Sequence, residues 1–90
     1  MKKYLSDLKK GEVSTILSFD TSRIKDKEFA EDLEDRLLEI GFEEGLEVEL
    51  LHEGPISRDP IAVKIGNITI GLRRAEADAI IISSTETIPQ

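Results

Sequence analysis

The sequence has no cysteine, no tryptophan, a single histidine and no long apolar run. Without cysteine the chain cannot form disulfides, thiolate metal sites or a thiol nucleophile. One histidine and no serine in a nucleophile elbow leave the common hydrolase triads incomplete, and no glycine pair is followed by the G-K-[ST] of a phosphate loop. No apolar run approaches the roughly 20 residues of a membrane-spanning helix. These absences argue against an enzyme and against insertion into a membrane.

Positive charge is also scarce, because 12 Lys and Arg face 19 Asp and Glu, a formal net charge of −7. Nucleic acids and anionic membranes are bound mainly through Lys and Arg, so this balance argues against both as partners. The few aromatic side chains also oppose single-strand binding, which uses exposed aromatic platforms in a basic groove. Ten carboxylates lie between Glu28 and Glu49, against the single base Arg36. We expect a solvated face there, with a surface for a basic partner as the alternative.

The clearest local signal is a β-hairpin over residues 61–72. Two alternating runs flank Gly66-Asn67, a two-residue loop that suits a type II′ turn. That turn sets the register, which places three apolar pairs on one face: Ile65 with Ile68, Val63 with Ile70, and Ile61 with Leu72. A lone hairpin is marginally stable, so other elements must cover this face.

An amphipathic helix is predicted between the first and second strands. Its apolar residues recur at spacings of four, four and three, at Phe29, Leu33, Leu37 and Ile40. Asp26 is placed to cap the first turn, and Gly41 can end the helix in a left-handed conformation with Phe42 packing back on Leu37.

The remaining elements are short. Strands are predicted over residues 12–19, 46–50 and 79–82, and single helical turns over residues 5–11 and 73–78. Residues 52–60, with two prolines and a glycine, are predicted to form a loop.

These elements predict one domain over residues 1–90, with an ordered core of residues 5–82 and a flexible tail of residues 83–90. About five antiparallel strands with one helix between the first and second predict a mainly β, SH3-like barrel, with an OB-like barrel as the alternative. We expect closure of the barrel to hide the sheet edges.

The order and spacing of several positions resemble the FeoA family, the small protein A of bacterial and archaeal ferrous iron transport. The SH3-like domain of this family also occurs at the C-terminal end of some iron-dependent repressors. The resemblance covers nearly the whole chain from Leu5 to Ile82, with two departures: a longer and more acidic helix, and Glu44 where a proline commonly precedes the glycine. The matching positions are Leu5, Leu8, Gly11, Arg36, Leu37, Ile40, Gly41, Phe42, Gly45, Asp59, Pro60, Ile61, Leu72, Arg73, Arg74, Glu76, Ala77, Ile80 and Ile82.

The resemblance implies a non-enzymatic cytoplasmic accessory protein that binds or regulates the FeoB-type ferrous iron permease, at the inner face of the membrane. Docking on the cytoplasmic part of the permease would use exposed residues near the hairpin end and the helix stop. The alternative for the arginines is ordinary surface pairing with the acidic excess. The sequence is also compatible with self-association of the protein into a homo-oligomer. The residues expected to bind the partner are Arg36, Glu43, Glu44, Arg73, Arg74 and Glu76.

Two other functions remain as alternatives: an SH3-like interaction module of an iron-dependent regulator, and a weak divalent-metal-binding protein. His52 and Glu53 are neighbours on an extended segment, so their side chains point to opposite sides. A set of carboxylates shares one helix face at Glu28, Glu31, Asp32 and Asp35. Cages for hard cations take ligands from different elements, so we expect no metal site and no cofactor.

Overall fold

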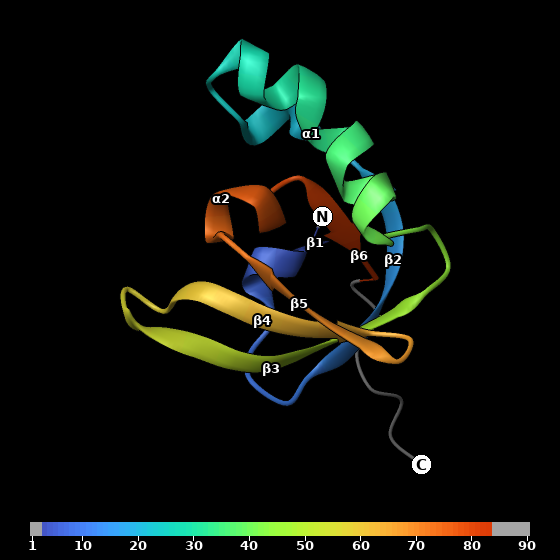
Figure 1. Cartoon of the computed structure of the whole chain (residues 1–90), viewed down its shortest axis with the longest axis vertical. Coiled ribbons are helices and arrows are strands. Elements are labelled where there is room, and N and C mark those ends of the chain that lie inside the picture. Colours follow the sequence, from blue (N-terminus) through green and yellow to red (C-terminus); the bar gives the residue numbers. More distant parts are fainter. Residues whose placement is uncertain (1–2, 84–90) are drawn as a thin grey trace.

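The structure is a computed structural model that describes residues 3–83. Six strands form one antiparallel sheet in the order β1-β6-β2-β3-β4-β5. Figure 1 shows the sheet strongly bent, with α1 rising from one end of it. The strands are β1 (Lys3–Tyr4), β2 (Val13–Phe19), β3 (Glu47–Ile56), β4 (Asp59–Ile65), β5 (Ile68–Leu72) and β6 (Ile80–Ile82). The helical elements are the 3₁₀ turns η1 (Leu5–Asp7) and η2 (Thr21–Arg23) and the helices α1 (Lys27–Ile40) and α2 (Arg74–Ala77).

The predicted hairpin is confirmed as β4 and β5. Its three apolar pairs have the expected register, with Ile65 opposite Ile68, Val63 opposite Ile70 and Ile61 opposite Leu72. Gly66 has a φ of 57°, as the first central residue of a type II′ turn requires. The inward face of this hairpin supplies a large part of the core.

The predicted helix is confirmed as α1, and both of its ends have the expected caps. The Asp26 carboxylate accepts a hydrogen bond from the Phe29 amide at 3.1 Å. At the other end Gly41 has a φ of 127°, and the Phe42 amide donates to the Leu37 carbonyl at 3.0 Å, which is the long bond of a Schellman stop.

Residues 52–60 were predicted to form a loop, and this prediction is wrong. β3 continues to Ile56, and a second tight hairpin joins it to β4 through Ser57 and Arg58, whose φ values are 56° and 57°. Strand pairing continues past Gly54 and Pro55 because the register of β3 against β4 shifts there. The two residues, which usually interrupt a regular strand, therefore lie in an irregular part of β3. The result is an arm that projects beyond β2 (Figure 1).

The strand count and the closure of the sheet also differ from the prediction. The sequence predicts about five strands, whereas the described chain has six, because two residues of β1 pair with β6. The sheet does not close on itself, so the term barrel applies only loosely. β5 is left at one end of the strand order, and the expectation that closure hides the edges is therefore wrong for this strand.

The core lies within the bend of the sheet, and Leu33 and Leu37 of α1 join it from one end. It contains no polar or charged side chain among the described residues. Of the four apolar positions predicted along α1, Leu33 and Leu37 are fully buried, Phe29 is partly buried and Ile40 is 38% exposed. The predicted tail, residues 83–90, lies outside the described residues except for Ser83.

Candidate functional site

Arg74, one of the residues predicted to bind a partner, is largely occupied within the protein. Its side chain is 19% exposed and donates to the Glu53 carboxylate at 2.7 Å, to the Arg58 carbonyl at 2.7 Å and to the Ser6 carbonyl at 2.8 Å. Its amide donates to the Asp59 carboxylate at 3.0 Å. Arg74 therefore joins η1, the β3–β4 arm and α2, and little of its guanidinium faces solvent.

Arg36, Arg73 and Glu76 are brought together where α1 meets α2. The Arg36 guanidinium lies 3.3 Å from the Glu76 carboxylate, and the Arg73 amide donates to the same carboxylate at 2.9 Å. The Glu76 side chain is only 13% exposed, whereas that of Arg36 is 52% exposed. The two arginines are therefore the accessible members of this group, and Glu76 holds the Arg36 guanidinium and the main chain of Arg73.

Glu43 and Glu44 lie apart from this group along the chain, in the turn between α1 and β3. Both are exposed, and neither side chain makes a hydrogen bond or ion pair within residues 3–83. Gly45, with a φ of 92°, donates its amide to the Ile16 carbonyl and so anchors the turn to β2. The two glutamates are thus presented to solvent by a fixed turn.

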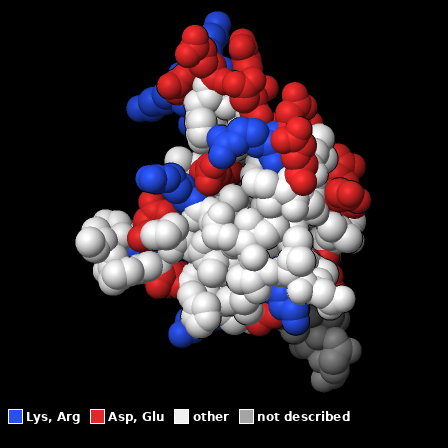
Figure 2. All heavy atoms as spheres, viewed as in Figure 1, with Lys and Arg blue, Asp and Glu red and all other residues white. Residues whose placement is uncertain are grey.

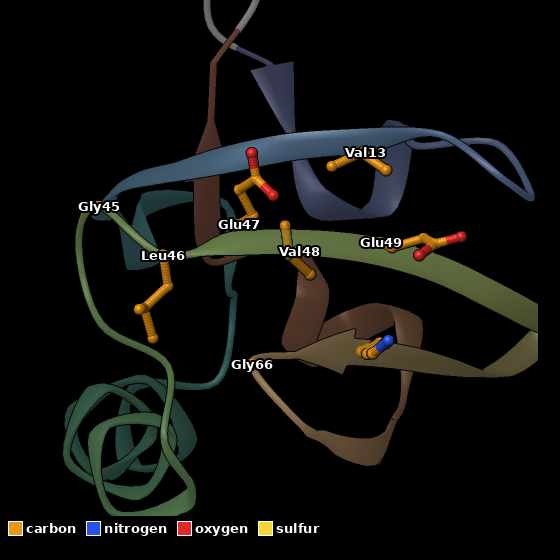
Figure 3. Close-up of a pocket in the computed structure, with 8 residues that line it drawn as sticks. Val13, Gly45, Leu46, Glu47, Val48, Glu49 and Gly66 are labelled. Atoms are coloured by element: carbon orange, nitrogen blue, oxygen red, sulfur yellow. The ribbon is translucent and has the colours of Figure 1, made fainter.

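A shallow groove of about 380 Å³ lies beside this turn, along the start of β3 (Figure 3). Two half-exposed apolar side chains, Val13 and Leu46, line it together with charged side chains. The described lining residues include no serine, threonine, cysteine or histidine. The lining residues are Val13, Gly45, Leu46, Glu47, Val48, Glu49, Lys64 and Gly66.

A second hollow of about 320 Å³ lies near the tip of the β3–β4 arm, beside the turn at Ser57 and Arg58, and is lined by Ile56, Asp59, Pro60 and Arg73. Ile56 is 77% exposed, the highest value among the large apolar side chains described. A predicted partner-binding residue, Arg73, thus shares a hollow with an exposed isoleucine. The partner-binding set predicted from the sequence does not contain Ile56, although its sequence position allows either a core side chain or part of an exposed apolar patch.

The described residues contain no group of three or more His, Cys, Asp or Glu side chains that could hold a metal ion. His52 is exposed, while the neighbouring Glu53 is committed to Arg74. The carboxylates of α1 lie on a solvated surface, seen as red spheres over α1 in Figure 2. Within residues 3–83, no helix is both long and apolar enough to span a bilayer.

Comparison with known proteins places these features in a family. The model of the FeoA domain matches residues 3–84. Stenotrophomonas maltophilia FeoA, solved in complex with zinc, is 27% identical, with 91% of each chain covered and a TM-score of 0.73. Iron(II) transport protein A from Clostridium thermocellum is 34% identical, with 89% of this chain and 44% of that chain covered and a TM-score of 0.72.

The fold is also shared with a regulator. A manganese-dependent transcriptional repressor is 19% identical, with 93% of this chain and 42% of that chain covered and a TM-score of 0.72, which shows a common fold. No curated protein matches the chain at a significant level. The SH3-like fold predicted from the sequence is confirmed by these structures.

Proposed function

The chain belongs to the FeoA family, and from this premise we propose that it is a non-enzymatic accessory protein that binds the cytoplasmic part of a FeoB-type permease. The family relates the chain to ferrous iron transport and is a family of small SH3-like accessory domains. The match over residues 3–84 is the observation that carries the proposal. Binding of this kind places the protein at the cytoplasmic face of the membrane.

The surface around Arg73 supports a role in protein–protein contact. Arg73 and Ile56 line one hollow, and Arg36 is held beside α2 by Glu76. Arginine is enriched among interface hot spots. Arg74 and Glu76 leave the predicted docking set, because both are engaged inside the fold. Arg36, Arg73, Glu43 and Glu44 stay in it, and the exposed Ile56 is added.

The test is calorimetric titration of the full chain with the purified cytoplasmic domain of its own organism's ferrous permease, with and without guanine nucleotide and ferrous ion. The variant carries Arg36→Glu and Arg73→Glu. Its control is Lys25→Glu, an exposed lysine in the loop before α1. We expect binding by the natural protein and the control, and binding at least tenfold weaker by the double variant.

Two results would count against this proposal. Absence of binding in every nucleotide state would refute docking on that domain. Equal binding by the double variant and the control would support the permease domain as the partner but refute binding through Arg36 and Arg73.

A second candidate is an interaction module that works with an iron-dependent regulator, which the fold shared with the manganese-dependent repressor favours. Titration with the metal-loaded regulator of the same organism tests it. Binding to the regulator without binding to the permease domain would favour this second function.

A further inference from the structure

β5 is an end strand of the sheet, and one of its sides has no neighbouring strand. It pairs with β4 in an uninterrupted register from Ile68 to Leu72. In an antiparallel pair joined by a two-residue turn, the residues next to the turn exchange main-chain hydrogen bonds, and every second residue does so after them. The main-chain groups of Ile68, Ile70 and Leu72 therefore point to β4, whereas those of Thr69 and Gly71 point away from it.

The outward main-chain groups of β5 are open to solvent. Thr69 and Gly71 are both exposed, and because Gly71 has no side chain, its exposed surface is the main chain itself. A Cβ atom built on Gly71 would meet nothing within 4 Å. Their amides and carbonyls point away from β4, and within residues 3–83 neither residue makes a hydrogen bond to another element. The edge of β5 thus offers two free amides and two free carbonyls in strand geometry.

The other free edges are protected against pairing, and β5 is not. After the part that pairs with β2, one side of β3 is free. In this part the pairing of β3 with β4 shifts register twice, and Pro55 lacks an amide. β1 is only two residues long. Short strands, irregularities and prolines are the usual means by which proteins prevent added strands. β5 has five residues, a regular register, and neither proline nor a charged side chain.

The charges near this edge indicate what would bind to it. Ile68 lies at the end of β5 next to Gly41, since a Cβ atom at Gly41 would be 3.7 Å from the Ile68 Cδ1 atom. Three exposed carboxylates lie within three residues of Gly41, at Glu39, Glu43 and Glu44. Figure 2 shows acidic side chains over α1, with several basic ones among them, above a largely uncharged area over β4 and β5. A second copy of the chain would bring another net charge of −7.

We propose that the edge of β5 binds an extended segment of a partner protein, which adds to the sheet as a further strand and carries lysine or arginine near the Ile68 end. Main-chain hydrogen bonds to Thr69 and Gly71 would supply affinity, and the carboxylates near Gly41 would select basic residues. The identity of the partner as the permease rests on the proposed function. Binding of an extended basic segment to the edge of β5 does not depend on which protein carries that segment.

The test uses a synthetic peptide in which three lysines precede a run of alternating valine and threonine. It is titrated into the full-length protein and followed by the amide NMR signals. We expect the amides of Thr69 and Gly71 to shift and to become protected from hydrogen exchange, while those of Ile68 and Ile70 are already protected in the free protein. A peptide with glutamates in place of the lysines should bind at least tenfold more weakly.

Two controls separate strand addition from simple charge attraction. Thr69→Pro removes an outward amide and leaves the bonds to β4 in place, so binding should weaken about tenfold. Thr69→Val keeps the amide and should bind within twofold of the natural protein. If Thr69→Pro does not fold, the same comparison is made on the natural protein with a peptide methylated at every amide nitrogen, which should not bind.

The proposal is overturned if the methylated peptide binds as tightly as the parent peptide, or if the protein forms a dimer that Thr69→Pro abolishes, since a second copy would then occupy the edge. Binding of the peptide without binding of the permease domain would support the edge and refute the partner of the proposed function. Binding of the permease domain without peptide binding would refute the edge alone.

Discussion

Replacement of Arg74 by methionine should destabilise the protein far more than an ordinary surface substitution. Methionine keeps most of the length and apolar character of the side chain and removes only the guanidinium. The three bonds that are lost, to Glu53, Arg58 and Ser6, have lengths of 2.7, 2.7 and 2.8 Å. The substitution therefore isolates the polar contribution of the contact that joins η1, α2 and the β3–β4 arm.

The expected loss follows from the burial of these groups. A hydrogen bond from a charged donor contributes about 1.5–3 kcal/mol when its partner is left without an alternative, and less when water can replace it. The Arg74 and Glu53 side chains are 19% and 21% exposed, so water can solvate part of what is lost. With about 1 kcal/mol for each of the three bonds, the free energy of unfolding should fall by about 3 kcal/mol. For a chain of this size that corresponds to a melting temperature lower by roughly 12–24 °C.

The assay is urea unfolding followed by circular dichroism, because the chain has no tryptophan. The matched control is Arg36→Met, which removes one ion pair of a guanidinium that is 52% exposed. Its cost should be below about 1 kcal/mol. Equal losses for the two variants would show that the Arg74 contacts are not formed in solution, and the assignment of Arg74 to the interior would then be wrong.

Three further substitutions test single features of the fold by urea unfolding. Gly54→Ala places a Cβ atom against the main chain of Asp59 and should lower the free energy of unfolding by about 1–3 kcal/mol. In the control, Gly71→Ala, the added Cβ atom enters open space. An equal loss of stability at both sites would contradict this contrast. Asp26→Ala removes the cap of α1 and should cost about 1 kcal/mol with a weaker helical signal at 222 nm; an unchanged signal and stability would contradict the cap. Leu37→Ala should cost about 2–5 kcal/mol by opening a cavity under α1, and a loss below 1 kcal/mol would mean that the helix is not packed on the core.

The parts of the fold that depend on nearby residues could be predicted from the sequence. The register of β4 and β5 follows from a two-residue turn that begins with Gly66, and the end of α1 follows from Gly41 and Phe42. In both places the residues that define the structure lie within a few positions of one another. The hydrophobic periodicity of the strands and the helix then agrees with these local signals.

The parts that depend on distant residues could not be predicted. β1 has two residues and is a strand only because Lys3 and Tyr4 meet β6. The β3–β4 arm contains Gly54 and Pro55, which indicate a loop when nothing is known of the strand beside them. Its turn at Ser57 and Arg58 also lacks the glycine or asparagine that usually marks a tight hairpin.

The same limit applies to the candidate site. Arg74 was predicted to bind a partner because an arginine next to a hairpin end is exposed by default. Its acceptors on Arg58, Glu53 and Ser6 lie 16, 21 and 68 positions away, so no local pattern indicates them. Arg36 and Arg73 are exposed, and their role in binding a partner stays a prediction.

The position of β6 has a consequence for how the chain folds during synthesis. β6 lies between β1 and β2, with Lys3 and Ile16 both opposite Ile82. The β3–β4–β5 meander needs only contacts between neighbours in sequence and can form early, whereas the first two strands lack their common neighbour until residues 80–82 have been translated. A nascent chain that ends before Ile80 therefore exposes one side of β2 and part of the apolar core to other molecules. The last strand described is thus the one that joins the N-terminal segment to the rest of the sheet.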